Sequence, residues 1–138
     1  MILLDASGLL AAWDGSEPRH ESALRELRHS RPPRLLSPLV LAELDYLIAA
    51  RAGIQERLAL LEEVSLGAYR LTPWAADDVA EARTVVDRYR DLGVSLADAS
   101  IVVLAHRHRV RDVLTLDERH FRVLPGPGGP FRLLPADA

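Results

Sequence analysis

Four acidic side chains from distant parts of the chain are candidates for a shared chemical site. Asp5 and Asp117 each follow a short apolar run, whereas Asp98 and Glu43 each lie in the first two turns of a predicted helix. Carboxylate oxygens are the ligands that the hard ions Mg²⁺ and Mn²⁺ prefer. Such ions activate water and stabilise the charge that develops when a phosphodiester is cleaved. The four acids therefore indicate metal-assisted hydrolysis, provided that the fold brings them together.

The elements that must position these acids alternate along the chain. Short apolar runs predict strands at 2–4, 34–36, 69–71, 113–116 and 131–134, and helical patterns at about 6–13, 18–29, 38–51, 55–63, 73–90 and 96–107 lie between them. Strands that alternate with helices predict a parallel sheet covered on both faces. We therefore expect a single α/β domain over residues 1–138, a three-layer α/β/α sandwich with a short four- to five-stranded parallel sheet.

The carboxyl edge of that sheet is where ligands bind in open α/β folds. Asp5 and Asp117 follow strands and so lie at this edge. A helix that leads into a parallel strand starts at the same edge, which adds Asp98 and brings Glu43 near. The residues three and four positions from Glu43 and Asp98 are mostly apolar, which predicts that both acids face the interior. Clustered, buried carboxylates raise one another's pKa unless a cation intervenes.

A second interpretation of the acids requires no metal. Helix N-termini attract carboxylates through the helix dipole, and Asp77 and Asp78 are expected at the carboxyl edge by the same argument. The Ser95–Asp98 spacing is that of a capping box, as is the spacing from Thr115 to Glu118. The pattern of acids alone leaves both interpretations open.

Composition excludes several function classes. The 138 residues contain no Cys, and all 17 basic residues are Arg, which excludes thiolate chemistry, a P-loop and a Schiff-base lysine. Lys and Asn are both missing, which is typical of a codon bias towards G and C, so the arginines are no evidence for phosphate binding. No His-Glu-x-x-His or Gly-x-Ser-x-Gly motif occurs, which disfavours a zinc hydrolase and a serine hydrolase.

Net charge and hydropathy bear on partners and location. The net charge of −3 disfavours a nucleic-acid binder, but four carboxylates neutralised by metal leave 17 positive against 16 negative residues. Apolar runs are far shorter than the roughly 20 residues of a membrane span, and no basic leader precedes the first apolar run. We therefore expect a cytoplasmic protein without membrane contact.

Four ordered motifs carry a family resemblance. They are Ile-Leu-Leu-Asp5-Ala-Ser7, Ser37-Pro-Leu-Val-Leu-Ala-Glu43, Leu96-Ala-Asp98-Ala and Leu114-Thr115-Leu-Asp117-Glu-Arg-His-Phe121. In this order they resemble the motifs of the PIN-domain ribonucleases, and within them the VapC toxins of bacterial toxin–antitoxin pairs. The resemblance extends over nearly the whole chain. It implies a PIN-like sandwich, Mg²⁺- or Mn²⁺-dependent cleavage of RNA, neutralisation by a VapB-type antitoxin, and a homodimer.

The resemblance also implies roles for the individual acids. Asp5, Asp98 and Asp117 would be catalytic metal ligands. Glu43 would bind the metal directly or through water, or would position the attacking water.

Four neighbouring residues are predicted to support the acids or the substrate. Ser7 and Thr115 either hold a carboxylate or a metal-bound water by a hydrogen bond or cap helices, and the sequence leaves both roles open. Arg119 and His120 lie close to Asp117 in the sequence and are the predicted RNA contacts.

Two further regions stand outside the acidic motifs. The helices between residues 38 and 63 have apolar residues on more than one face, which predicts a homodimer seam or an antitoxin groove. The Pro/Gly-rich loop from Pro125 to Pro130 has no predicted function.

Two alternatives belong to other function classes. A catalytically inactive PIN-fold module would act through protein or RNA binding, but a dead site has no need to keep burying four charges. A phosphatase that forms an aspartyl-phosphate is disfavoured because Asp5-Ala6-Ser7 lacks a second Asp two residues on and the chain has no Lys.

Overall fold

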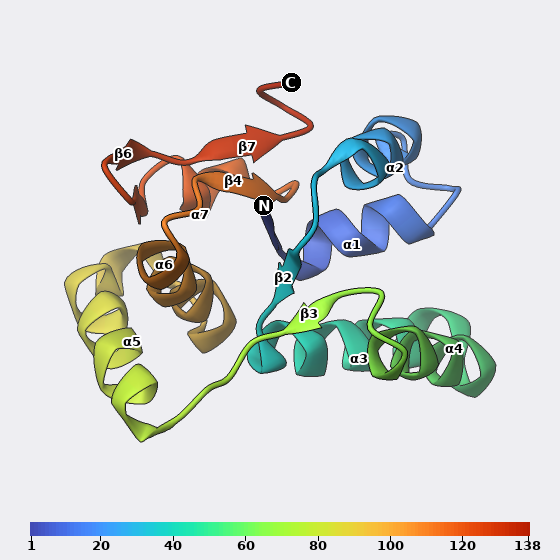
Figure 1. The fold of residues 1–138 in the computed structure, drawn as a ribbon, viewed down its shortest axis with the longest axis horizontal. Helices are drawn as coiled ribbons and strands as arrows, with labels where there is room; N and C mark the ends of the chain where they lie inside the picture. Colours follow the sequence, from blue (N-terminus) through green and yellow to red (C-terminus); the bar gives the residue numbers. More distant parts are fainter.

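Five short strands form one parallel sheet at the centre of the computed structural model, which describes all residues 1–138. They are β1 (Ile2–Leu4), β2 (Arg34–Leu36), β3 (Arg70–Leu71), β4 (Asp112–Leu114) and β7 (Arg132–Leu134), in the order β3-β2-β1-β4-β7 (Figure 1). β1 and β4 are direct neighbours, with Leu4 paired to Leu114. The acids that follow these two strands therefore emerge side by side, as the sequence predicts.

Helices cover both faces of the sheet, which confirms the predicted sandwich. They are α1 (Ala6–Trp13), α2 (His20–His29), α3 (Pro38–Ala52), α4 (Ile54–Ser65), α5 (Ala76–Arg88), the 3₁₀ turn η1 (Arg90–Leu92), α6 (Leu96–His108) and α7 (Glu118–Phe121). In Figure 1, α1 to α4 lie on one side of the sheet and α5 and α6 on the other. Right-handed crossovers require this split, because the strand order reverses its direction after β3.

The strands are apolar on both faces because both faces are covered. Ile2, Leu3 and Leu4 of β1 are fully buried, as are Val113 and Leu114 of β4. This core fixes the central strands and, with them, the starting points of the segments that carry Asp5 and Asp117.

Two helix starts follow the predicted capping chemistry. The Ser37 hydroxyl accepts a hydrogen bond from the Leu39 amide (3.2 Å), and Pro38 is the first helical residue of α3. Ser95 and Asp98 form a reciprocal capping box at the start of α6, with bonds of 3.0 and 3.1 Å. Both starts are rigid supports for the acids on these helices.

Two other helix starts differ from the prediction. The second helix begins at His20 rather than near residue 18, and α5 begins at Ala76 rather than after Thr72-Pro73. Thr72 extends the strand pairing instead, because its backbone amide and its hydroxyl both bond to the Leu36 carbonyl (2.9 and 3.3 Å).

The predicted capping box at Thr115 is also wrong. α7 is capped by Asp117, whose Oδ1 accepts the His120 amide at 3.0 Å, while the Thr115 hydroxyl turns toward Asp5.

The Pro/Gly-rich segment is an ordered hairpin. Pro125–Gly126 (β5) pairs antiparallel with Gly129–Pro130 (β6). The Arg111 guanidinium donates to the Pro130 carbonyl at 2.9 and 3.1 Å, so this hairpin is tied to the segment that precedes β4.

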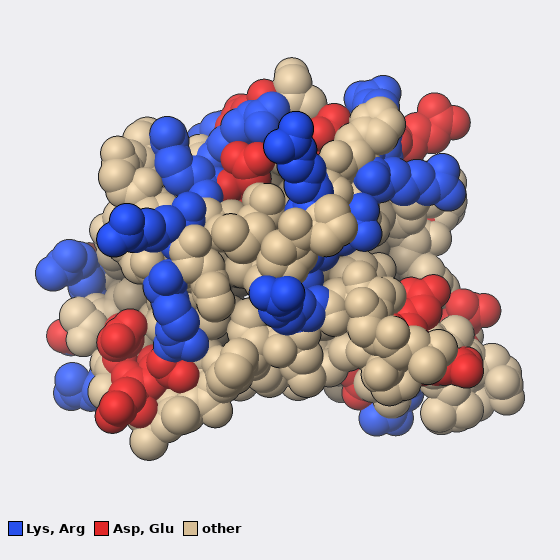
Figure 2. Space-filling view, viewed as in Figure 1, with Lys and Arg blue, Asp and Glu red and all other residues tan.

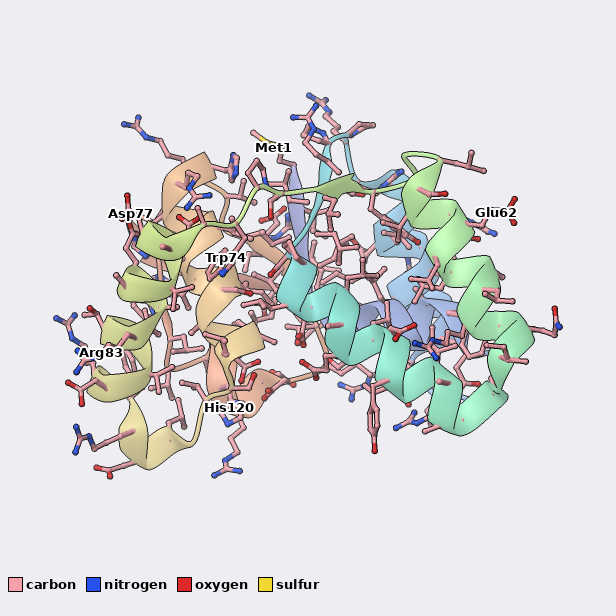
Figure 3. All side chains as sticks on the ribbon, turned by 90° about the horizontal axis from the view of Figure 1, so that it is seen from below. Met1, Glu62, Trp74, Asp77, Arg83 and His120 are labelled. Atoms are coloured by element: carbon pink, nitrogen blue, oxygen red, sulfur yellow. The ribbon has the colours of Figure 1, made fainter.

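Arginines predominate at the amino edge of the sheet. Arg34, Arg70 and Arg132 each begin a strand, whereas β4 begins with Asp112, which pairs with Arg132. Figure 2 shows many arginine side chains, with acidic ones among them, on the face that carries the amino ends. The candidate acids lie at the opposite edge. In Figure 3, Met1 and the labelled His120 mark these two ends of the molecule. No helix is long and apolar enough to cross a bilayer.

Candidate active site

Asp5 is the innermost of the candidate acids. It lies between β1 and α1 at the centre of the sheet, and only 5% of it is exposed. Its Oδ2 accepts hydrogen bonds from the Ser7 and Thr115 hydroxyls, both at 2.7 Å. Because each hydroxyl donates its single hydrogen to Asp5, both hydroxyl oxygens remain free to accept.

The same two hydroxyls hold the loop that carries Asp117. Ser7 Oγ accepts the Leu116 amide at 3.0 Å, and Thr115 Oγ1 accepts the Asp117 amide at 2.9 Å. Of the two roles that the sequence left open, the geometry therefore favours support of a carboxylate over helix capping. One hydrogen-bonded network joins the ends of β1 and β4 and fixes Asp5 relative to Asp117.

Asp98, Asp117 and His120 form the tightest group of metal-ligating side chains. One ligand atom from each lies within 4.8 Å of the others. The His120 Nδ1 is 2.8 Å from Asp117 Oδ2 and 3.4 Å from Asp98 Oδ2. Asp98 is 8% exposed, as expected from its apolar neighbours. The predicted RNA contact His120 thus faces the acids.

Glu43 lies at the rim of this group. The prediction that it faces the apolar interior is wrong, because the residue is exposed and Tyr46 on the following turn is 73% exposed. Glu43 is nevertheless close enough to the other acids for their charges to affect its pKa. Partial burial raises the pKa of its carboxyl, and the charges of Asp5, Asp98 and Asp117 raise it further.

The predicted position of the acids at the start of α5 is wrong. Asp77 lies in the half of the molecule that holds Met1, away from His120 (Figure 3). Asp78 pairs with Arg107, which lies near the C-terminal end of α6, whereas Asp98 lies at the start of this helix. The segment after β3 runs to α5 on the side of the molecule that holds Met1, so this helix starts away from the carboxyl edge (Figure 3).

Electrostatics at the carboxyl edge favour a bound cation. Burial raises the pKa of Asp5 above its ordinary value, and the charge of Asp98 raises it further, whereas the two hydroxyl hydrogen bonds lower it. Such mutual repulsion is relieved when a divalent ion lies among the carboxylates. The donor set is mainly carboxylate oxygen, which fits Mg²⁺ or Mn²⁺. Asp5, Asp98 and Asp117 are the acids whose orientation is fixed by hydrogen bonds.

The comparison with protein families agrees with this arrangement of acids on a parallel sheet. Residues 2–126 match the family model described as PIN domain. The chain belongs to the PIN-domain family. All four candidate acids lie within the matched residues.

Known proteins place the chain near the VapC-type members of the PIN-domain family. It is 42% identical over 135 residues to Ribonuclease VapC26 of Mycobacterium tuberculosis, a match that covers 97% of this chain and 100% of that protein.

Two solved structures share the PIN fold of this chain. One is VapC20 of Mycobacterium tuberculosis, a toxin that cleaves the sarcin–ricin loop; it aligns with a TM-score of 0.78 at 23% identity and covers 85% of this chain and 90% of its own. The other is a toxin–antitoxin complex from Klebsiella pneumoniae, with a TM-score of 0.69 at 19% identity, covering 96% of this chain and 99% of its own.

Sequence reasoning missed several residues that support the site of this PIN domain. The Leu92 carbonyl contacts His120 Nε2 at 3.1 Å, and nothing in the sequence signals this contact. The buried Ser100 bonds Ser37 at 2.7 Å and thereby ties α6 to the start of α3. The sequence feature that could have indicated this contact is the single hydroxyl residue within the apolar run Ala99-Ser100-Ile101.

Proposed function

We propose that this PIN-domain protein is an endoribonuclease toxin that depends on Mg²⁺ or Mn²⁺ and cleaves RNA phosphodiester bonds. The observation that carries the proposal is the convergence of Asp5, Glu43, Asp98 and Asp117 at one edge of the sheet. Partial burial there raises the pKa of Glu43, and the charges of the other three acids raise it further. The 42% identity to a VapC ribonuclease supports the substrate class.

The four acids have different proposed roles, which follow from their surroundings. Asp5, Asp98 and Asp117 hold the metal, because their positions are fixed by hydroxyl and backbone hydrogen bonds. A bound divalent ion supplies Lewis-acid stabilisation of the charged phosphate and activates water. Glu43 is exposed at the rim with a raised pKa, so it can orient the attacking water and accept its proton.

RNA reaches the site past Arg119. This residue is exposed and lies two positions from Asp117, at the start of α7. A guanidinium binds phosphate oxygens with charge-assisted hydrogen bonds, so Arg119 is the proposed RNA contact. Because RNA is abundant in the cytoplasm, we propose that the protein acts there.

The helices α1, α3 and α4 form the proposed interface for protein partners. Exposed apolar side chains gather on them, namely Trp13, Tyr46, Ile54, Leu58 and Leu61. A small apolar cavity of about 40 Å³, lined by Leu9, Trp13, Leu44 and Ile48 among others, opens beside them. A VapB-type antitoxin is the first proposed partner, by analogy with the toxin–antitoxin complex that shares this fold. A second copy of the chain is the other proposed partner, because the exposed apolar side chains could also form a homodimer seam.

The proposed activity is tested by incubating the purified chain, freed of antitoxin, with total cellular RNA. Matched reactions contain Mn²⁺, Mg²⁺ or excess EDTA, and Asp5→Asn controls for contaminating nucleases. We expect discrete fragments that require both metal and Asp5. Cleavage that persists in EDTA or in the Asp5→Asn protein would contradict the proposal, and a complete absence of cleavage with either metal would favour the binding module.

A further inference from the structure

The imidazole of His120 points into the acidic site rather than toward solvent. Only 17% of its side chain is exposed. Its Nδ1 lies 2.8 Å from Asp117 Oδ2 and 3.4 Å from Asp98 Oδ2. The residue comes from α7, while Asp98 comes from α6, so the ring bridges two elements at the carboxyl edge (Figure 3).

The opposite ring nitrogen is fixed by the backbone. His120 Nε2 lies 3.1 Å from the carbonyl oxygen of Leu92, the last residue of η1. A carbonyl only accepts hydrogen bonds, so Nε2 carries a hydrogen. Most histidines that bind a metal through one nitrogen donate the other N–H to a carbonyl or carboxylate. His120 has this arrangement at Nε2. Its Nδ1 faces carboxylate oxygens, which also only accept, so without a metal Nδ1 donates a hydrogen to Asp117 Oδ2. A bound ion would take the place of this hydrogen.

The distances suit ligands of one ion. Ligand atoms about 2.1 Å from an octahedral ion lie about 3 Å from their neighbours, and the two Nδ1–oxygen distances of 2.8 and 3.4 Å lie on either side of this value. The two carboxylate oxygens of Asp117 make different contacts. Oδ1 accepts the His120 amide at 3.0 Å, while Oδ2 faces the ring.

We propose that His120 Nδ1 is a ligand of the same divalent ion that Asp98 and Asp117 hold. This inference rests on the proposed metal-dependent function and extends its ligand set beyond carboxylates. Imidazole is a softer donor than carboxylate and suits transition metals better than Mg²⁺. The site therefore prefers Mn²⁺ over Mg²⁺, and His120 acts at the metal rather than as an RNA contact.

Pulsed electron paramagnetic resonance of bound Mn²⁺ tests the Mn–N contact without any measurement of activity. We expect the wild-type protein to show ¹⁴N modulation that changes to the ¹⁵N pattern when only histidine is ¹⁵N-labelled. His120→Gln loses the modulation. His106→Gln keeps it, because this exposed histidine bonds only the Pro125 carbonyl in the hairpin. The isotope exchange in the wild-type protein needs no variant to fold.

Titration calorimetry with Mn²⁺ and Mg²⁺ tests the metal preference. We expect His120→Gln to lose at least about 10-fold in Mn²⁺ affinity and less in Mg²⁺ affinity. Mn²⁺ that binds without histidine nitrogen modulation, or modulation that survives in His120→Gln, would overturn the inference and leave the proposed function intact. Failure of the wild-type protein to bind either ion would contradict the inference and the proposed function together.

Discussion

Among single residues, Asp5 carries the clearest link between charge and stability. Burial raises the pKa of its carboxyl above the ordinary value of 3.8. A raised folded-state pKa means that the folded chain holds the proton more tightly than the unfolded chain. The resulting stability is complete below the ordinary pKa and is lost as the pH rises through the higher folded-state value.

Asp5→Asn is therefore expected to stabilise the metal-free protein at neutral pH. The free energy of unfolding of the variant exceeds that of the wild type at pH 7. The difference shrinks as the pH falls through the raised folded-state pKa of Asp5 and is smallest below about 4. Urea unfolding in EDTA across this range measures the effect. A variant whose stability follows the wild-type pH dependence would contradict the assignment of a strained, buried charge to Asp5.

Thr115 is expected to matter through the two groups that its hydroxyl joins. Thr115→Val keeps the shape but leaves the Asp117 amide without its acceptor and removes one of the two donors to Asp5. We expect a loss of about 1–3 kcal/mol in the free energy of unfolding and a decrease of about 10–100-fold in RNA cleavage. Thr84→Val is the matched control, because that hydroxyl is exposed on α5 and makes only a 3.4 Å contact. Equal effects of both variants would argue against the network.

Among the secondary-structure elements, the contact between α1 and the end of β4 sets the distance between Asp5 and Asp117. Gly8 permits this contact, since a Cβ there would lie 2.2 Å from the Leu114 carbonyl oxygen. A shift of either backbone segment to relieve this contact would displace site residues, because both segments carry them.

Gly8→Ala is expected to destabilise the fold by about 1–3 kcal/mol or more and to lower RNA cleavage by displacing α1 from β4. Gly15→Ala is the control, because nothing lies within 4 Å of its added Cβ. Thermal unfolding and cleavage are compared for the two variants. Full stability of Gly8→Ala would contradict the close packing of α1 on β4.

The sequence predicts those elements whose signals are local. Apolar runs mark the strands, and the cap at Ser37 and the box at Ser95 mark two helix starts, so the edge that collects Asp5, Asp98 and Asp117 is predictable. The start of α5 is not predictable, because Thr72 bonds to Leu36 as an extension of the strand instead of capping the helix. The inward turn of His120 depends on Leu92, 28 residues earlier, and no local pattern reports such a contact.

For the molecule as a whole, the separation of charge between the two sheet edges has a functional consequence. The carboxyl edge carries the four candidate acids, whereas three of the five strands begin with an arginine at the amino edge (Figure 2). An RNA phosphate that approaches the acids meets repulsion unless a divalent ion neutralises them. Metal binding and the stability of the folded chain are coupled for the same reason.

Divalent ions are therefore expected to stabilise the whole domain. At a free Mn²⁺ concentration 100 times its Kd, the free energy of unfolding rises by about 2.7 kcal/mol, and EDTA reverses the gain. Asp117→Asn removes most of this stabilisation. Thermal unfolding with and without Mn²⁺ measures the effect, and an equal gain in Asp117→Asn would place the ion elsewhere.

The central claim is that the acids at the carboxyl edge perform metal-dependent cleavage, and a pair of matched aspartates tests it most directly. Asp98 and Asp78 both accept a backbone amide three residues earlier at a helix start, but only Asp98 lies beside Asp117 and His120. RNA cleavage in Mn²⁺ is measured for Asp98→Asn and Asp78→Asn. We predict a loss of at least about 100-fold for Asp98→Asn and near wild-type cleavage for folded Asp78→Asn. Full activity of Asp98→Asn, or an equal loss in both variants, would contradict the account.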